Sequence, residues 1–125
     1  ETPWPMHGCD ISRLMQDPSV ESDHPVLMIF TNRIYGQNTR NIPAPDEFQK
    51  YPWWVSYRQG KHKYIRHLIE DEIEELYDLD ADPEELTNLA LDAAHASLLE
   101  NLRAATIEEL RRTECPYVDI MPAVR

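Results

Sequence analysis

The stretch that decides the fold runs from residue 53 to residue 90 and reads WWVSYRQGKHKYIRHLIEDEIEELYDLDADPEELTNLA. Two runs with alternating side-chain character, residues 53–58 and 61–67, lie on either side of Gly60. Glycine adopts a positive φ without a steric clash, so Gly60 suits the tight turn of a hairpin. A third extended run, residues 74–79, follows an acidic connection. The pattern predicts a small antiparallel sheet.

Two motifs in this stretch resemble the C-terminal subdomain of the sulfatase family, alkaline-phosphatase-like hydrolases of sulfate esters. The pattern R-x-G-x-x-K-Y-I is matched by residues 58–65, and E-L-Y-D-L-x-x-D-P-x-E-x-x-N-L-A by residues 75–90. Upstream, residues 7–15 are similar to the H-G-x-D-L-S-x-L-L segment that leaves the catalytic domain of a sulfatase. The resemblance implies that residues 1–25 are a linker from an absent catalytic domain. Residues 26–125 would be the subdomain itself.

Composition narrows the possible partners of the chain. A chain of 125 residues suits one domain, and no apolar run is long enough to span a bilayer. The net charge of −11 argues against nucleic acid or an anionic membrane surface as a partner. The sequence starts at Glu1 without a methionine or a signal segment, which implies processing or a boundary set by design. Spacing leaves open whether Cys9 and Cys115 form a disulfide.

The remaining elements follow from hydrophobic spacing. Residues 26–31 (VLMIFT) are expected to form a central strand that is covered on both faces. Residues 32–52 are polar, contain three prolines and are unusually long for a plain connection, so they form the candidate functional loop. Asp82 followed by Pro83 predicts the start of a short helix. A long helix is expected over residues 91–112, where apolar residues recur at helical spacing.

We therefore expect an α+β fold, in which a small antiparallel sheet of about four strands is covered on one face by the long C-terminal helix. The helix residues expected in the interface are Leu91, Leu98, Leu102 and Leu110. The sheet residues expected to meet them are Val55, Tyr57, Tyr64, Ile65 and Leu79. The side of the sheet that carries Trp54 is left for a contact with the catalytic domain.

Three groups of residues carry side chains that could act as a nucleophile or bind a metal ion. Cys9 lies in C-x-I-x-R, where sulfatases carry C-x-[PA]-x-R with a cysteine that is oxidised to formylglycine, so a nucleophilic Cys9 is disfavoured. Asp78, Asp80 and Asp82 resemble the opening of a calcium loop but lack its later glycine and glutamate. The histidines 62, 67 and 95 share no metal-ligand spacing. The acidic run 70–92 reads chiefly as a solvated face, with an acidic interaction surface as the alternative.

Five residues in or next to the long loop are candidates for binding substrate. Guanidinium groups pair with sulfate oxygens, and aromatic rings stack on the faces of sugars. The resemblance to sulfatases makes a sulfated sugar a reasonable ligand for such a set, and an ordinary charged surface loop is the alternative. The candidate residues are Arg33, Tyr35, Arg40, Trp53 and Trp54.

The resemblance implies a function for the chain as part of a larger enzyme. It would be the C-terminal part of a hydrolase of sulfate esters, inactive by itself, which buttresses the catalytic domain of the same polypeptide and lines the substrate pocket. Calcium and formylglycine would belong to that catalytic domain, and a sulfated glycan is a candidate substrate. Export to the periplasm or outside the cell is common among glycan sulfatases. A free-standing binding or assembly module without hydrolysis is the alternative, and a small independent hydrolase that uses Cys9 is a further one.

Overall fold

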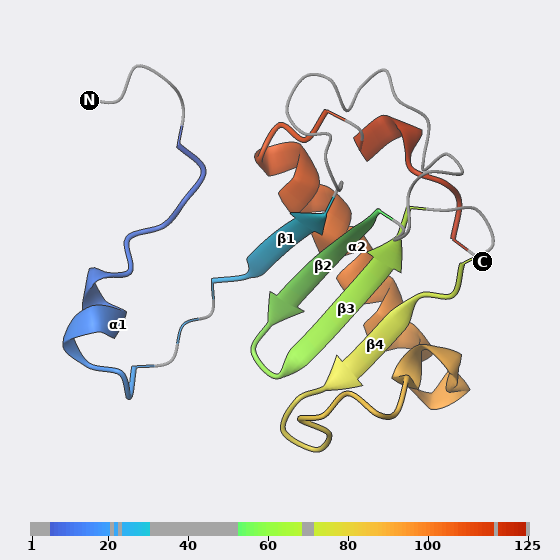
Figure 1. Cartoon of the computed structure of the whole chain (residues 1–125), viewed down its shortest axis with the longest axis horizontal. Coiled ribbons are helices and arrows are strands. Elements are labelled where there is room, and N and C mark those ends of the chain that lie inside the picture. The colour runs from blue at the N-terminus through green and yellow to red at the C-terminus, as the bar shows by residue number, and fades with distance from the viewer. Residues whose placement is uncertain are drawn as a thin grey trace.

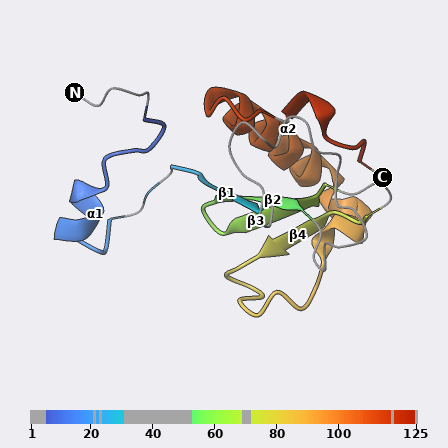
Figure 2. The same ribbon diagram turned by 45° about the horizontal axis from the view of Figure 1, so that its top comes forward.

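The structure, a computed structural model, describes residues 6–20, 22, 24–30, 53–68, 72–116 and 118–124. Four antiparallel strands form one sheet in the order of the sequence, and a long helix lies across one face of it (Figures 1 and 2). The α+β prediction is therefore confirmed. The strands are β1 (Val26–Phe30), β2 (Trp54–Gln59), β3 (His62–His67) and β4 (Glu75–Asp78). The helical elements are α1 (Ser12–Gln16), η2 (Leu89–Leu91), η3 (Ala93–His95), α2 (Ala96–Arg112) and η4 (Val118–Ile120).

The central hairpin forms where its sequence predicts. β2 and β3 pair so that Tyr57 lies opposite Tyr64, and Gly60 in the turn has φ of 56°. Side chains with a Cβ resist that conformation, which explains why glycine stands there. Outside the turn, Arg58 Nε donates to the carbonyl oxygen of Gly60 at 3.2 Å. The hairpin is thus fixed by turn chemistry as well as by side-chain alternation.

The core lies between the sheet and α2. The buried residues of α2 recur every three or four positions and so form one stripe along the helix; they are Leu99, Leu102, Thr106 and Leu110. Two clusters of buried side chains meet this stripe. One contains Trp53, Val55, Leu68, Leu110 and Cys115, and the other contains Tyr57, Tyr64, Leu76, Leu99 and Leu102.

Several expected core contacts are wrong in detail. The buried stripe of the helix passes through Leu99, whereas Leu98 is partly buried and packs against the same core cluster, and Leu91 is 70% exposed. Leu91 misses the core because the long helix begins at Ala96, after two short 3₁₀ turns. Ile65 alternates with the buried Tyr64 and so faces away from α2. Leu79 belongs to neither core cluster.

The strand expected at the centre of the sheet lies at its edge instead. β1 pairs only with β2, and Val26 and Met28 are 53% and 56% exposed. Continuous apolar runs are typical of strands that are covered on both faces, which is why VLMIF predicted a central strand. Here the run has one face under α2 and the other without cover from the described elements.

No helix begins at Asp82. Its carboxylate accepts a hydrogen bond from the backbone nitrogen of Thr87 at 2.8 Å, five residues on, and Glu85 has a positive φ of 57°. The Asp-Pro pair therefore shapes a turn, and Asn88 takes over the capping role, accepting from the backbone nitrogens of Leu76 and Ala90. Asn88 thereby connects β4 to the first 3₁₀ turn.

The N-terminal segment with α1 stands beside the β1 edge, away from the sheet (Figure 1). Arg112 of α2 donates a hydrogen bond to the carbonyl oxygen of His7 in this segment, at 3.1 Å. None of the residues of α1 is buried, and Met15 is 78% exposed. Within the described residues, no helix has both the length and the apolar character needed to cross a membrane.

Candidate functional site

The sheet face opposite α2 is the main candidate surface, and we call it the outer face (Figure 2). Strand register and period-two alternation place alternate residues of all four strands on it. It is formed by Val26, Met28, Phe30, Trp54, Ser56, Arg58, Lys63, Ile65, His67, Glu75 and Tyr77. The half near β1 is apolar, and the half near β4 is polar.

The apolar half is built around two stacked rings. Phe30 of β1 and Trp54 of β2 are directly paired, with ring centroids 5.7 Å apart and planes 15° from parallel. Val26 and Met28 continue this surface along β1 and are more than half exposed. Exposed apolar side chains in one contiguous group are typical of surfaces that bind another protein element.

The polar half is a hydrogen-bonded group centred on Glu75. Glu75 Oε1 lies 2.7 Å from His67 Nε2, and the hydroxyl of Tyr77 donates to Oε2 at 2.6 Å. Burial alone would raise the pKa of Glu75, but the hydrogen bonds from Tyr77 and His67 outweigh it and lower this pKa below its usual value. Burial and the bond to Glu75 both raise the pKa of Tyr77. Glu75 is therefore held as a carboxylate.

One atom in this group has an unmet hydrogen-bonding capacity. His67 Nδ1 is buried and has no hydrogen-bond partner among the residues that the structure describes. Buried polar atoms without a partner are uncommon in native structures, because each costs free energy. Farther along β3, Lys63 donates to both carboxylate oxygens of Glu85, at 2.8 and 2.7 Å.

The structure places the two candidate tryptophans on opposite faces of the sheet. Trp53 is 3% exposed and lies in the core beneath α2, whereas Trp54 belongs to the outer face. The two rings therefore do not form one stacking surface. The other three candidates, Arg33, Tyr35 and Arg40, lie outside the described residues.

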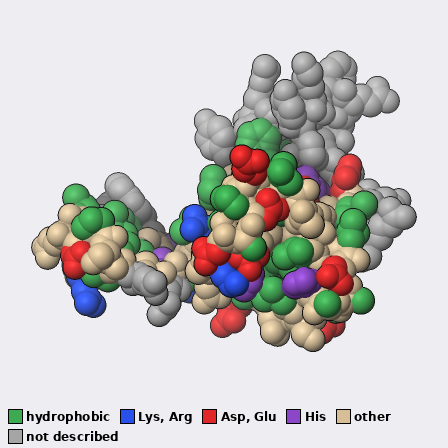
Figure 3. Space-filling model, turned by 90° about the horizontal axis from the view of Figure 1, so that it is seen from below, with side chains coloured by type: hydrophobic (Ala, Val, Ile, Leu, Met, Phe, Trp, Pro, Cys, Tyr) green, Lys and Arg blue, Asp and Glu red, His purple; other side chains and the backbone are tan. Residues whose placement is uncertain are grey.

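The aspartates of the calcium-like motif are used in a turn. Asp78 Oδ1 accepts from the backbone nitrogens of Asp80 and Ala81, and Lys61 Nζ donates to Oδ2 at 2.6 Å. The bond from Lys61 is the largest cause that lowers the pKa of Asp78. Seen from below, acidic side chains lie beside basic and histidine side chains on the body that carries the sheet (Figure 3). In the described ranges, no group of three potential ligands could hold a metal ion.

The thiols and the remaining histidines have ordinary surroundings. Cys9 is exposed and Cys115 is buried, and the two are not joined by a disulfide. His62 Nε2 lies 4.0 Å from Asp78 Oδ2, and His95 Nδ1 lies 3.1 Å from Asp92 Oδ2. Each of these two histidines thus neighbours a single carboxylate.

The sequence did not predict a buried ion pair on the side of the sheet that faces α2. Glu74 is only 6% exposed. Arg103 Nε donates to the two oxygens of its carboxylate, at 3.0 and 2.8 Å. A second Arg103 nitrogen and the hydroxyl of Tyr64 also donate to this carboxylate. Burial and the bond to Glu74 raise the pKa of Tyr64. The acidic run is therefore not solvated throughout. A signal was present, because Glu74 shares the strand face of Leu76, and an acid at a core position needs a partner.

Comparison with known proteins gives a likeness of fold. No protein-family model and no curated protein matches the chain. A Bacteroides thetaiotaomicron protein assigned as a sulfatase shares the fold over 94% of this chain and 22% of its own, with a TM-score of 0.66 and 22% identity. A 2-O GAG sulfatase matches 94% of this chain and 22% of its own (TM-score 0.65, 23% identity). A protein in complex with its substrate D-glucosamine-2-N,6-O-disulfate matches 91% of this chain and 21% of its own (TM-score 0.64, 16% identity). The chain spans about a fifth of the length of these sulfatases, which agrees with the resemblance to one of their subdomains.

Proposed function

We propose that this chain, whose fold matches about a fifth of each of those sulfatases, is the C-terminal part of a sulfatase-family hydrolase of sulfate esters. The observation that carries the proposal is the coverage: nearly the whole chain matches a small portion of each longer protein. Residues 1–25 would connect it to the catalytic domain, and residues 26–125 would form the subdomain. The chain alone would not hydrolyse sulfate esters.

The proposed partner is the catalytic domain of the same polypeptide, and the proposed contact is the apolar half of the outer face. Two features support this choice. Val26 and Met28 are exposed on the outer face, and exposed hydrophobic side chains also gather on the separate lobe that carries α1 (Figure 3). The linker and β1 lie on the same flank of the molecule, and both expose apolar side chains. One large partner domain could cover both.

The substrate role of the loop belongs to the same proposal. Arg33, Tyr35 and Arg40, with Trp54 at the exit of the loop, would lie at the rim of the substrate pocket, and the sulfate group of a glycan would meet the guanidinium groups. Trp53 would support this rim from the core and would not touch the sugar, since it is buried. Calcium and formylglycine would be supplied by the catalytic domain, since Cys9 lies in C-x-I-x-R and no group of three potential ligands among the described residues could hold a metal ion.

Gene context gives the first test. The coding region upstream of Glu1 should continue in the same reading frame and contain C-x-[PA]-x-R. A start codon directly before Glu1, with no sulfatase frame upstream, would contradict the proposal and favour a free-standing binding module. Where the frame continues, deletion of residues 26–125 should leave a catalytic part that is insoluble or inactive.

A matched pair of variants tests the contact surface. When the catalytic part and this chain are produced as separate polypeptides, they should co-purify, and Met28→Glu should weaken this association about tenfold or more. Leu91→Glu is the control, because Leu91 is also exposed and apolar but does not lie on the outer face. Equal effects of the two variants would rule out the outer face as the contact.

A further inference from the structure

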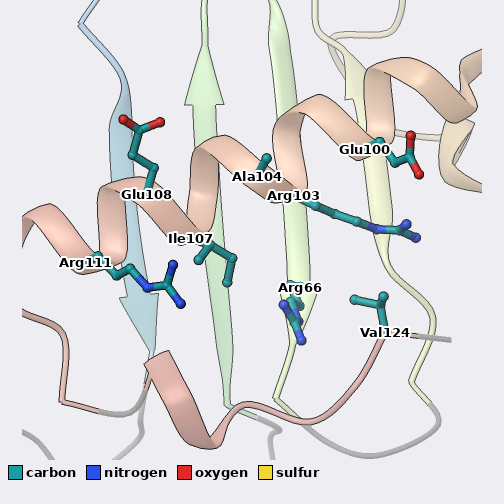
Figure 4. Close-up of a pocket in the computed structure, with 8 residues that line it drawn as sticks. All are labelled: Arg66, Glu100, Arg103, Ala104, Ile107, Glu108, Arg111 and Val124. Atoms are coloured by element: carbon teal, nitrogen blue, oxygen red, sulfur yellow. The ribbon is translucent and has the colours of Figure 1, made fainter.

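A hollow lies on the α2 side of the sheet, between α2 and the C-terminal segment. It has a volume of about 650 Å³, within the size range of small-molecule sites. Figure 4 shows Arg66 from β3, Arg103 and Arg111 from α2, and Ile107 and Val124 around it. Because the outer face lies on the opposite side of the sheet, this hollow would stay open in the proposed assembly.

The three guanidinium groups are not equally available to a ligand. Arg103 is already bound to the carboxylate of Glu74. Arg111 lies 3.8 Å from Asp119, and both side chains are exposed, so their attraction is weak. Arg66 forms no ion pair with any residue that the structure describes; it donates to the backbone oxygen of Pro122. Arg66 is thus a half-buried cation with N–H donors to spare.

Two acidic side chains, Glu100 and Glu108, also line the hollow. The carboxylate of Glu108 lies above the α2 ribbon in Figure 4, whereas Arg66, Arg111 and Val124 lie below it, and Glu100 lies toward the opposite end of α2 from Arg111. The lower part of the hollow therefore combines two cations with the apolar side chains of Ile107 and Val124. A chain with a net charge of −11 otherwise repels anions, which makes this local arrangement stand out.

We propose that this hollow binds the sulfate or phosphate group of a small organic monoester. Arg66 and Arg111 come from different elements, so each guanidinium can pair with a different edge of a tetrahedral oxyanion; a planar carboxylate presents only one such edge. Ile107 and Val124 contact the carbon body of the ligand. The ligand is bound and not hydrolysed, since the hollow contains no candidate nucleophile among the residues that line it. The site does not depend on the proposed catalytic partner.

The test is a titration of the 125-residue chain, labelled with ¹⁵N, followed by the NMR signals of the arginine side chains. The probes share one sugar body: N-acetylglucosamine 6-sulfate, N-acetylglucosamine 6-phosphate and unsubstituted N-acetylglucosamine. Glucuronate supplies the planar carboxylate. We expect saturable shifts of the Arg66 and Arg111 signals with one or both esters, weaker binding of glucuronate and none of the neutral sugar. Whether the sulfate or the phosphate binds more tightly identifies the natural group.

Variants separate a built site from general attraction. Arg66→Gln should weaken ester binding about tenfold or more, and Arg66→Lys should recover only part of it, because lysine keeps the charge without the paired donors. Arg111→Gln, at an exposed position, should also weaken binding and carries no risk to the fold. Glu108→Gln should tighten binding by removing a nearby negative charge. Arg58→Gln, on the outer face, should change nothing.

Three results would overturn the proposal. The first is the absence of a saturable shift with either ester. The second is an equal loss of affinity in Arg58→Gln and Arg66→Gln, which would indicate unspecific attraction. The third is binding of glucuronate as tight as that of the esters.

Discussion

Replacing Arg103 by methionine should lower the free energy of unfolding by about 3 kcal/mol. Arg103 is the cationic partner of the buried Glu74 and reaches both of its carboxylate oxygens. Removing one partner of a buried ion pair costs about 3–5 kcal/mol, because the other charge stays buried without compensation. The Arg103 side chain is partly exposed (27%), so solvent can reach the site and the low end of this range applies. Methionine keeps a long unbranched stem and a good helix propensity.

Urea unfolding followed by circular dichroism measures this loss. With a slope of about 1–3 kcal/mol/M, the midpoint should fall by about 1–3 M while the slope stays constant. Arg111→Met is the matched control, since it lies on the same helix and its ion pair is exposed; its effect should stay within about 0.5 kcal/mol. The double variant Glu74→Gln/Arg103→Met should be less destabilised than Arg103→Met, because no buried charge is left unpaired. Equal midpoints for Arg103→Met and Arg111→Met would refute the reasoning.

Three further predictions concern the core, the end of α2 and the chemistry. Leu110→Ala should lower the free energy of unfolding by about 2–5 kcal/mol, because Leu110 is fully buried in the core. Glu100→Ala, on the exposed side of α2, should change it by no more than about 0.5 kcal/mol. Similar small effects of both variants in urea unfolding would show that α2 does not pack as described. Glu114→Gly should raise the free energy of unfolding by about 0.5–1 kcal/mol, and with it the thermal midpoint, because Glu114 follows the helix C-cap with φ of 55°, a conformation that favours glycine. A lower thermal midpoint would count against this. The chain alone should not turn over an aryl sulfate with or without calcium, and turnover that is lost in Cys9→Ala would contradict the proposed function.

The hairpin and the helix could be predicted from sequence because local rules and tertiary packing agree there. Gly60 marks the turn, and alternation places Val55 and Tyr57 on the buried face, as observed. The apolar stripe on α2 was also predicted, but with Leu98 in the place of Leu99. Both residues are leucines, so only tertiary packing decides which of them is buried.

The predictions from sequence were wrong where tertiary contacts override the local sequence pattern. Asp82 and Pro83 carry the chemistry of a helix start, yet the Asp82 carboxylate bonds to Thr87 and the segment turns. The apolar composition of β1 is typical of a central strand, but composition does not reveal whether cover comes from this chain or from another domain. No sequence pattern marks Arg66 as a candidate binding residue, because its position in the hollow depends on its hydrogen bond to Pro122, which is distant in the sequence.

The sequential order of the strands has an evolutionary consequence. β1 and β2 are neighbours in the sheet, yet the whole segment from residue 31 to residue 53 lies between them in the sequence, while β2 and β3 are joined by a tight turn. The entropy of closing a loop grows only slowly with its length, and a doubling costs about 0.6 kcal/mol. Insertions and deletions between β1 and β2 are therefore tolerated far better than any change in the β2–β3 turn. Related chains are expected to diverge most in length at this connection, where new recognition residues can be acquired without loss of the fold.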